Sequence, residues 1–307
     1  IIGLIAIGIT FVLLYFWSGI LHEEIRYTRI STIASARSTV AIVVSLLSFT
    51  IIASYPKGKS DIPKSFFMTE KAFMIALIYG LVIMAGTSGV AGAVQGLLYN
   101  DMSEKVYMYL STISGFLAFT IFVGYFPDFR IDVDDEHRKV AQKQPRFLEI
   151  LLEYILVPIV LALTVVLILW AGKTVIQGIG NPFFILSSIA AAYTLGGLWL
   201  HLMTSDYDSE IAKFYRKIYP FSALIILVFE AWALVTRLQD TGLKIQEYMF
   251  GLIWIVALVS AALLILKKAK AYKDIIIILC ITAVISVMPI IGYYDLTVTM
   301  QLNRLEN

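Results

Sequence analysis

The sequence contains few of the residues from which catalytic and metal sites are built. Its 307 residues include one cysteine, Cys280, and three histidines, His22, His137 and His201. One cysteine excludes an internal disulfide, and the histidines form no metal-binding motif. Walker A, G-x-G-x-x-G and G-x-S-x-G patterns are absent from the sequence. We therefore predict no catalytic residue, no metal and no other cofactor.

Charged residues are also scarce. They make up 15% of the chain, against about 25% in a typical soluble domain. The net charge of +2 gives no reason to expect a nucleic-acid partner. Hydrophobic residues reach 59% and the mean hydropathy is +0.84. A soluble chain of this length needs more polar surface, so the excess indicates an apolar solvent, and we predict the lipid bilayer as the chain's partner.

The apolar residues form about nine blocks near the length of about 20 residues that crosses a bilayer. Backbone groups in lipid need partners within their own segment, so each block is expected to be a helix. The sequence predicts an all-α, polytopic transmembrane helical bundle in one domain, residues 1–307, whose second part begins at residue 147. The spans are expected at 1–21, 38–55, 72–99, 106–126, 147–171, 182–203, 218–235, 248–266 and 275–293.

The start of the chain and its loop charges predict the topology. Residues 1–21 lack a basic leader and a cleavage site, so we interpret them as a span and expect that further sequence precedes them. About two-thirds of the 24 Lys and Arg residues follow even-numbered spans. We therefore expect a multi-pass protein of a bacterial inner (cell) membrane, with even-numbered loops in the cytoplasm and the C-terminus outside. Arg26, Arg29 and Arg37 are exceptions to this bias.

The third span contains a stripe of small residues. Gly89, Gly92 and Gly96 recur at the spacing that lets two helices approach closely. The stripe has three interpretations: packing within the bundle, contact in a homo- or hetero-oligomer, or a flexible helix that lines a substrate path. Gln95 lies beside it, and we expect it to hydrogen-bond a neighbouring helix.

Glu230 is the carboxylate placed deepest in a predicted span. Ionisable side chains of this kind cost about 2.5–3.5 kcal/mol at the centre of a membrane helix. Arg237 lies two turns further on the same face, about 10 Å away, which is marginal for contact. With Gln95, these residues form our candidate intramembrane polar site. Glu230 is either a proton or cation site or a structural carboxylate that is protonated or paired.

Other polar residues lie at predicted span ends. Glu149 and Glu153 begin the fifth span, and His201 ends the sixth. A membrane-interface position explains all three, with the charged side chains reaching toward water.

Short motifs recur through the second half of the chain. A proline lies near the start of one span; a Tyr-Pro pair begins another that ends in arginine; a glycine turn, a tyrosine and a C-terminal Gln/Arg pair follow. In these motifs, residues 147–307 resemble a bacterial membrane family catalogued as domain of unknown function 4153. The motif residues are Pro158, Pro220, Trp232, Arg237, Gly242, Tyr248, Gln301 and Arg304.

The resemblance implies a membrane architecture but no activity, because the family's function is itself unknown. Thr241, Lys244 and Glu247 depart from the family's pattern of tyrosine, threonine and arginine. Any polar contacts that the family makes at this turn must therefore be made differently here.

Three functions are compatible with the sequence. A transport or permeation protein for a small solute or ion would use Glu230, and a water-filled cavity reaching it would favour this hypothesis. A non-catalytic scaffold or sensor subunit would use the third span, with a packed core and an exposed small-residue face. A membrane-embedded enzyme acting on lipid-linked substrates would need a cleft near Glu149, Glu153 and His201.

Overall fold

The computed structural model describes residues 32–55, 60–127, 136–177 and 183–306. Every regular element in these ranges is helical, which confirms the predicted all-α class. Seven segments within them are long and apolar enough to cross a membrane. One of the seven, Ile245–Ser286, contains two helices separated by a chain reversal. The predicted span at 1–21 lies outside the described residues.

The described residues separate into two compact units. The hairpin unit is Thr50–Glu149, and the bundle unit comprises the described parts of 1–49 and 150–307. The second boundary lies close to residue 147, where the family-like half was predicted to begin. Helix α2, Thr32–Ala53, crosses the first boundary.

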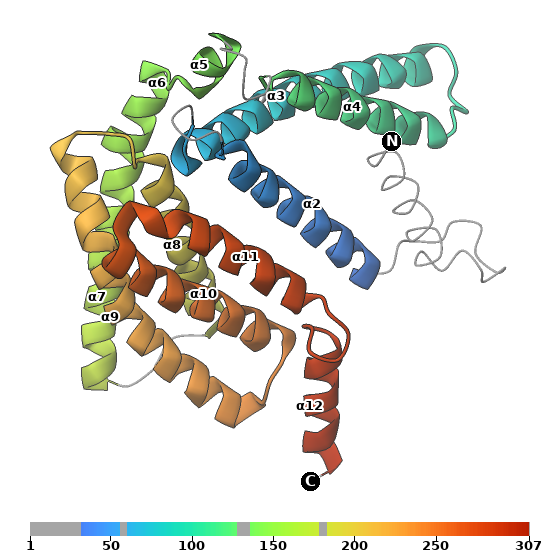
Figure 1. The fold of residues 1–307 in the computed structure, drawn as a ribbon. Helices are drawn as coiled ribbons and strands as arrows, with labels where there is room; N and C mark the ends of the chain where they lie inside the picture. Colours follow the sequence, from blue (N-terminus) through green and yellow to red (C-terminus); the bar gives the residue numbers. More distant parts are fainter. Residues whose placement is uncertain (1–31, 56–59, 128–135, 178–182, 307) are drawn as a thin grey trace. The chain divides into compact units, whose positions relative to one another are not determined.

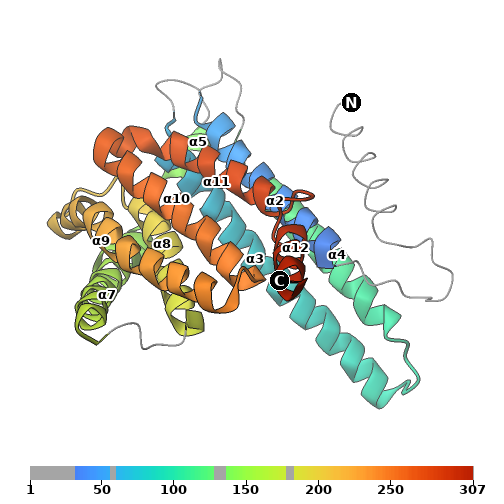
Figure 2. The same ribbon diagram turned by 90° about the horizontal axis from the view of Figure 1, so that it is seen from below.

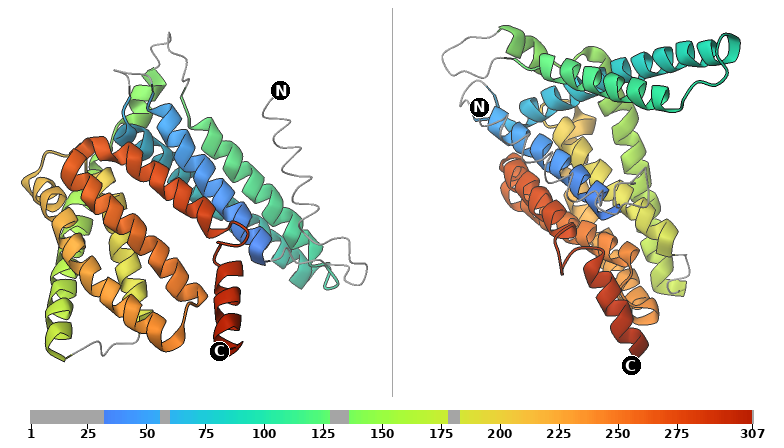
Figure 3. Two further views of the ribbon diagram at one scale, coloured as in Figure 1. Left: turned by 60° about the horizontal axis from the view of Figure 1, so that its bottom comes forward. Right: turned by 90° about the vertical axis from the view of Figure 1, so that its right-hand side faces the viewer.

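The hairpin unit is built around two long helices that lie side by side (Figures 1 and 3). They are α3, Ile62–Leu97, and α4, Lys105–Gly124. Asp61 caps α3 by accepting from the Lys64 amide at 2.9 Å, and a proline in the first turn suits this start.

The helices α3 and α4 approach closely at Gly80, where an added Cβ would lie 2.7 Å from the Ala118 Cβ. The short helices α5, Glu136–Gln142, and α6, Arg146–Glu149, complete the unit. Lys71 joins α3 to this segment by donating to the carbonyl of Val140 at 3.2 Å. Part of the predicted loop at 128–146 is therefore helical.

The bundle unit is arranged around α9, which packs against α7, α8 and α10. In turn, α10 lies beside α8 and α11 (Figures 1 and 2). Its elements after α2 are η1 (Ile150–Leu156), α7 (Val157–Gln177), α8 (Phe183–Met203), α9 (Glu210–Thr241), α10 (Ile245–Lys267), η2 (Lys268–Ala271), α11 (Tyr272–Ser286) and α12 (Asp295–Glu306).

Two prolines affect the helices of this unit. The segment η1 is a π-helix and ends just before Pro158. Proline lacks the N–H that would bond the carbonyl four residues earlier, and a local π-helical turn accommodates such a defect. Pro220 lies inside α9 and is buried. The last predicted span, 275–293, ends early at Ser286, because Pro289 cannot continue the helix.

The predicted topology places particular helix ends on the same side of the membrane. Side-chain contacts join these ends to each other. At one end, Ser209 bonds Glu153, and Tyr272 lies against His201. At the other end, Gln246 donates to Ser187 at 3.2 Å. The helices α7 to α11 therefore run alternately up and down. Below, the His201 end is called the inner end and the Gln246 end the outer end, names that assign no cellular compartment.

Candidate functional site

One face of α9 carries polar side chains into the interior of the bundle unit. Tyr215, Tyr219, Ser222 and Glu230 share this face at helical spacing, and none is more than 4% exposed. We call these four residues the α9 polar face. Buried polar groups require partners, so their contacts decide what this face can do.

At the inner end, His201 is buried, with 5% of its surface exposed. Its Nε2 lies 3.2 Å from the carbonyl of Arg216, and its Nδ1 lies 3.1 Å from the Tyr272 hydroxyl. A carbonyl only accepts, so the neutral ring carries its proton on Nε2. Arg216 itself donates to the carbonyls of Thr204 and Tyr207. Tyrosine rings from α9 and α11 cover His201, which lies in the last turn of α8.

The hydroxyl groups in the middle of the α9 polar face have hydrogen-bond partners on α8. Tyr215 donates to the Gly197 carbonyl at 2.8 Å, and Tyr219 donates to the Thr194 carbonyl at 2.9 Å. Tyr193 lies 3.2 Å from the Ser222 hydroxyl. An added Cβ at Gly197 would lie 2.2 Å from the Tyr219 ring, so only glycine permits this packing.

Glu230 ends the polar face without a complete set of partners. It is 1% exposed, and its Oε1 has no hydrogen-bond partner among the described residues. Tyr193 and Tyr219 lie within electrostatic range of its carboxyl group. Along α9 it is about 10 Å from Arg237 and about 21 Å from Arg216. Along α9, Glu230 therefore lies nearer Arg237 than Arg216.

Glu153 shows how a carboxylate is accommodated at the inner end. It is 2% exposed and accepts from the Ser209 hydroxyl at 2.8 Å. The same Ser209 caps α9 by accepting from the Ala212 amide. Glu149 is exposed, whereas the start of α9 covers Glu153.

Arg237 does not pair with Glu230. Its Nε lies 3.1 Å from Oε1 of Glu247, whose side chain is 1% exposed. Glu230 and Arg237, two residues of the predicted intramembrane polar site, therefore have separate environments. The third, Gln95, belongs to the other compact unit.

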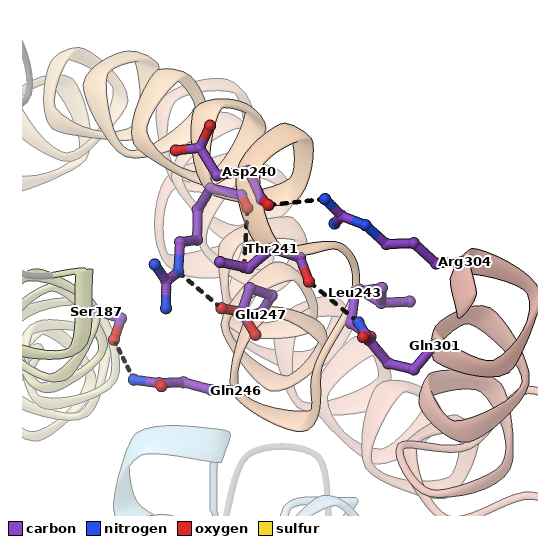
Figure 4. A network of polar contacts seen from close by, with 9 residues as sticks. Ser187, Asp240, Thr241, Leu243, Gln246, Glu247, Gln301 and Arg304 are labelled. Carbon is purple, nitrogen blue, oxygen red and sulfur yellow. Dashed lines mark hydrogen bonds and ion pairs between the residues drawn. The ribbon is translucent and has the colours of Figure 1, made fainter. Parts of the chain in front are cut away.

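The outer end of the bundle unit contains a network between α12 and the α9–α10 turn (Figure 4). Gln301 donates to the carbonyls of Thr241 and Leu243 at 3.2 and 3.0 Å. Arg304 donates to the carbonyl of Asp240 at 2.7 Å. The last carbonyls of a helix have no partner within it, so these side chains cap the C-terminus of α9.

Several family-like motif residues meet in this network. Gly242, with φ of 71°, lies beneath the side chains of Gln301 and Arg304. Tyr248 donates nearby to the carbonyl of Ile291 at 2.7 Å. The remaining motif residues are elsewhere: Pro158 follows the π-helix, Pro220 is buried within α9, and Trp232 is 46% exposed.

The glycine stripe of α3 is largely open within the hairpin unit. Gly89 and Gly96 would meet nothing within 4 Å of an added Cβ, and at Gly92 the Tyr107 hydroxyl would lie at 3.6 Å. The same hydroxyl donates to Gln95 at 2.8 Å, which confirms the predicted bond to a neighbouring helix. The stripe therefore does not form the close contact between α3 and α4, which is made at Gly80.

A surface cleft of about 760 Å³ lies at the reversal between α10 and α11, lined by Leu266, Lys267, Lys268, Ala269, Lys270 and Asp274. Glu230 and His201 do not line it. Across the described ranges, no three His, Cys, Asp or Glu residues are grouped as a metal site would require.

Comparison with known proteins finds no matching family model, curated protein or solved structure. The resemblance to domain of unknown function 4153 therefore stays a prediction.

Proposed function

We propose that this chain is a membrane transport or permeation protein that passes a proton or a small cation, with Glu230 as the exchanging group. The observation that carries the proposal is the unpaired Oε1 of a 1% exposed carboxyl group. An unsatisfied buried acceptor costs about 1–3 kcal/mol. Glu153 accepts from a hydroxyl, and Glu247 is paired with a guanidinium through Oε1, although its Oε2 also has no partner among the described residues. A carboxyl group that bears this cost is a candidate for a site that binds and releases a proton or a cation.

The α9 polar face supplies a route for the transported ion. From the inner end, His201, the tyrosine hydroxyls and Ser222 lead toward Glu230. The interior is packed around this route, which corresponds to a closed conformation. Opening would require a helix to deform, and the π-helix η1 and Pro220 in α9 are features at which helices deform.

We also propose nine spans in a bacterial inner membrane, with even-numbered loops in the cytoplasm and the C-terminus outside. The alternation of α7 to α11 supports this path for the second half. Cysteines introduced at Lys139 and Lys268, in a Cys280→Ser background, should resist an impermeant thiol reagent in intact cells. Labelling at both positions would reverse the proposed orientation.

The transport proposal is tested with the full chain reconstituted in liposomes. Influx of protons, Na⁺ or K⁺ is followed with ion-sensitive dyes under an imposed gradient. Glu230→Gln keeps the size of the side chain and removes its charge, so flux should fall at least tenfold while thermal stability is unchanged or rises. Glu210→Gln, which neutralises an exposed carboxylate of the same helix, is the matched control and should keep its flux.

Two results would overturn the proposal. One is wild-type flux of all three ions no higher than that of empty liposomes. The other is Glu230→Gln protein that transports at the wild-type rate. A fall in flux shared equally by Glu210→Gln would show a general effect of charge rather than a site.

A second candidate is the non-catalytic scaffold or sensor subunit, favoured by the open glycine stripe and by the packed interior around Glu230. A homo-oligomer through α3 should be shifted toward monomer by Gly89→Leu with Gly96→Leu, measured by light scattering in detergent. Gly115→Leu is the control, because Gly115 on α4 also meets open space. No observation favours the enzyme hypothesis, since Glu153 and His201 are both buried and bonded.

A further inference from the structure

The cleft between α10 and α11 is separate from the α9 polar face and carries its own charge. Two of its lysines, Lys268 and Lys270, are exposed and form no hydrogen bond or ion pair with any described residue. The third, Lys267, is neutralised by Asp274, with Nζ to Oδ2 at 2.6 Å. Two unpaired ammonium groups therefore line a cleft of about 760 Å³.

The backbone that carries these lysines is fixed by the buried residues that follow it. Ala271 and Tyr272 directly follow them and are 0% and 5% exposed. The Tyr272 hydroxyl is anchored against His201. Lys268 has a φ of 53°, a conformation that glycine adopts without strain. A lysine at this position keeps a charge where the backbone alone would favour glycine.

The apolar part of the cleft indicates the kind of anion. Leu266 lines it, is 79% exposed, and belongs to the last turn of a predicted span. Its side chain therefore lies at the boundary where hydrocarbon gives way to headgroups. A soluble anion would bind the lysines but would make no favourable contact with the exposed leucine. A phospholipid has both a phosphate for the lysines and an acyl chain for the leucine.

We propose that this cleft binds the headgroup of an anionic phospholipid, with Lys268 and Lys270 on the phosphate and Leu266 against the start of an acyl chain. Lysines next to a span attract anionic headgroups, and contacts between ammonium and phosphate groups are charge-assisted. The proposal does not depend on transport by Glu230.

The test uses the full chain in neutral detergent micelles, where no anionic surface exists and only a local site retains the lipid. Binding of fluorescent phosphatidylglycerol is measured with phosphatidylcholine as the neutral comparison. Lys268→Gly with Lys270→Gln removes both unpaired charges and suits the backbone at residue 268. Affinity should fall at least tenfold. Lys173→Gln with Lys244→Gln, two exposed lysines outside the cleft, is the matched control and should change affinity less than twofold.

The outcomes separate a lipid site from its alternatives. Equal losses in both double variants would show that overall charge attracts the lipid, and would overturn the proposal. Equal affinity for phosphatidylglycerol and phosphatidylcholine would overturn it too. Displacement of the lipid by inorganic phosphate at equal concentration would show a soluble-anion site and overturn the proposal. A Leu266→Asn variant that binds the lipid more weakly but inorganic phosphate equally well would support the acyl contact.

Discussion

Replacing Gly242 with alanine tests the capping of α9 by α12. Gly242 has φ of 71° and ψ of −176°, a region that is essentially restricted to glycine. An alanine Cβ would lie 2.8 Å from Nη1 of Arg304 and 2.9 Å from Nε2 of Gln301. Backbone strain costs about 1–3 kcal/mol, and displacing the two Gln301 bonds costs about 0.5–1.5 kcal/mol each. We expect Gly242→Ala to lower the free energy of unfolding by about 2–6 kcal/mol.

The assay is unfolding by SDS titration from mixed micelles, followed by tryptophan fluorescence. Gly251→Ala is the control, because its Cβ would meet only Leu234 at 3.8 Å, and alanine suits the interior of α10. In a background of Gln301→Ala and Arg304→Ala, Gly242→Ala should cost only its backbone part, about 1–3 kcal/mol. Wild-type stability of Gly242→Ala, or a cost equal in both backgrounds, would refute the reasoning that α12 presses on this turn.

Three further substitutions test the interior of the bundle unit by the same unfolding assay. Gly197→Ala should destabilise by about 1–3 kcal/mol because its methyl group meets the Tyr219 ring; an unchanged protein would show that α8 and α9 are not this close. Tyr272→Phe leaves His201 Nδ1 without its donor and should cost about 1–3 kcal/mol, whereas a neutral result would place the ring in water. Trp254→Phe removes an indole donor to a carbonyl of α9 at 2.8 Å and should cost about 1 kcal/mol; no loss would argue against that bond.

The positions of the helices were largely predictable because span length and local capping are encoded within each segment. The start of α3 follows from Asp61 and the proline two residues later. The start of α9 was predicted at residue 218 but lies at Glu210, because a polar segment that reads as a loop continues the helix beyond its apolar core. Ser209 caps this extension.

The buried faces were less predictable than the spans. Lipid and a protein interior are both apolar, so the periodicity that marks the core of a soluble helix is weak in a membrane helix. This explains why His201 and Glu153 were assigned to the interface. The predictable parts were those with a second signal: Glu230 stood out by its charge, and Gln95 by its position beside the glycine stripe. The partners of Arg237 and Gln301 depend on how distant segments pack, which no single segment specifies.

The three buried glutamates of the bundle unit show why Glu230 is the informative one. Glu153 lies where α9 begins and accepts a hydrogen bond from the residue that caps that helix. Glu247 lies where α10 begins and holds an arginine that is 39% exposed, so part of this pair's charge remains hydrated. Both lie near helix ends, whereas an ionisable side chain costs most at the centre of a membrane helix. Glu230 has neither a cap nor a cation, and it lies several turns inside α9. The transport proposal is therefore built on Glu230 rather than on Glu153 or Glu247, and the flux of Glu230→Gln tests it.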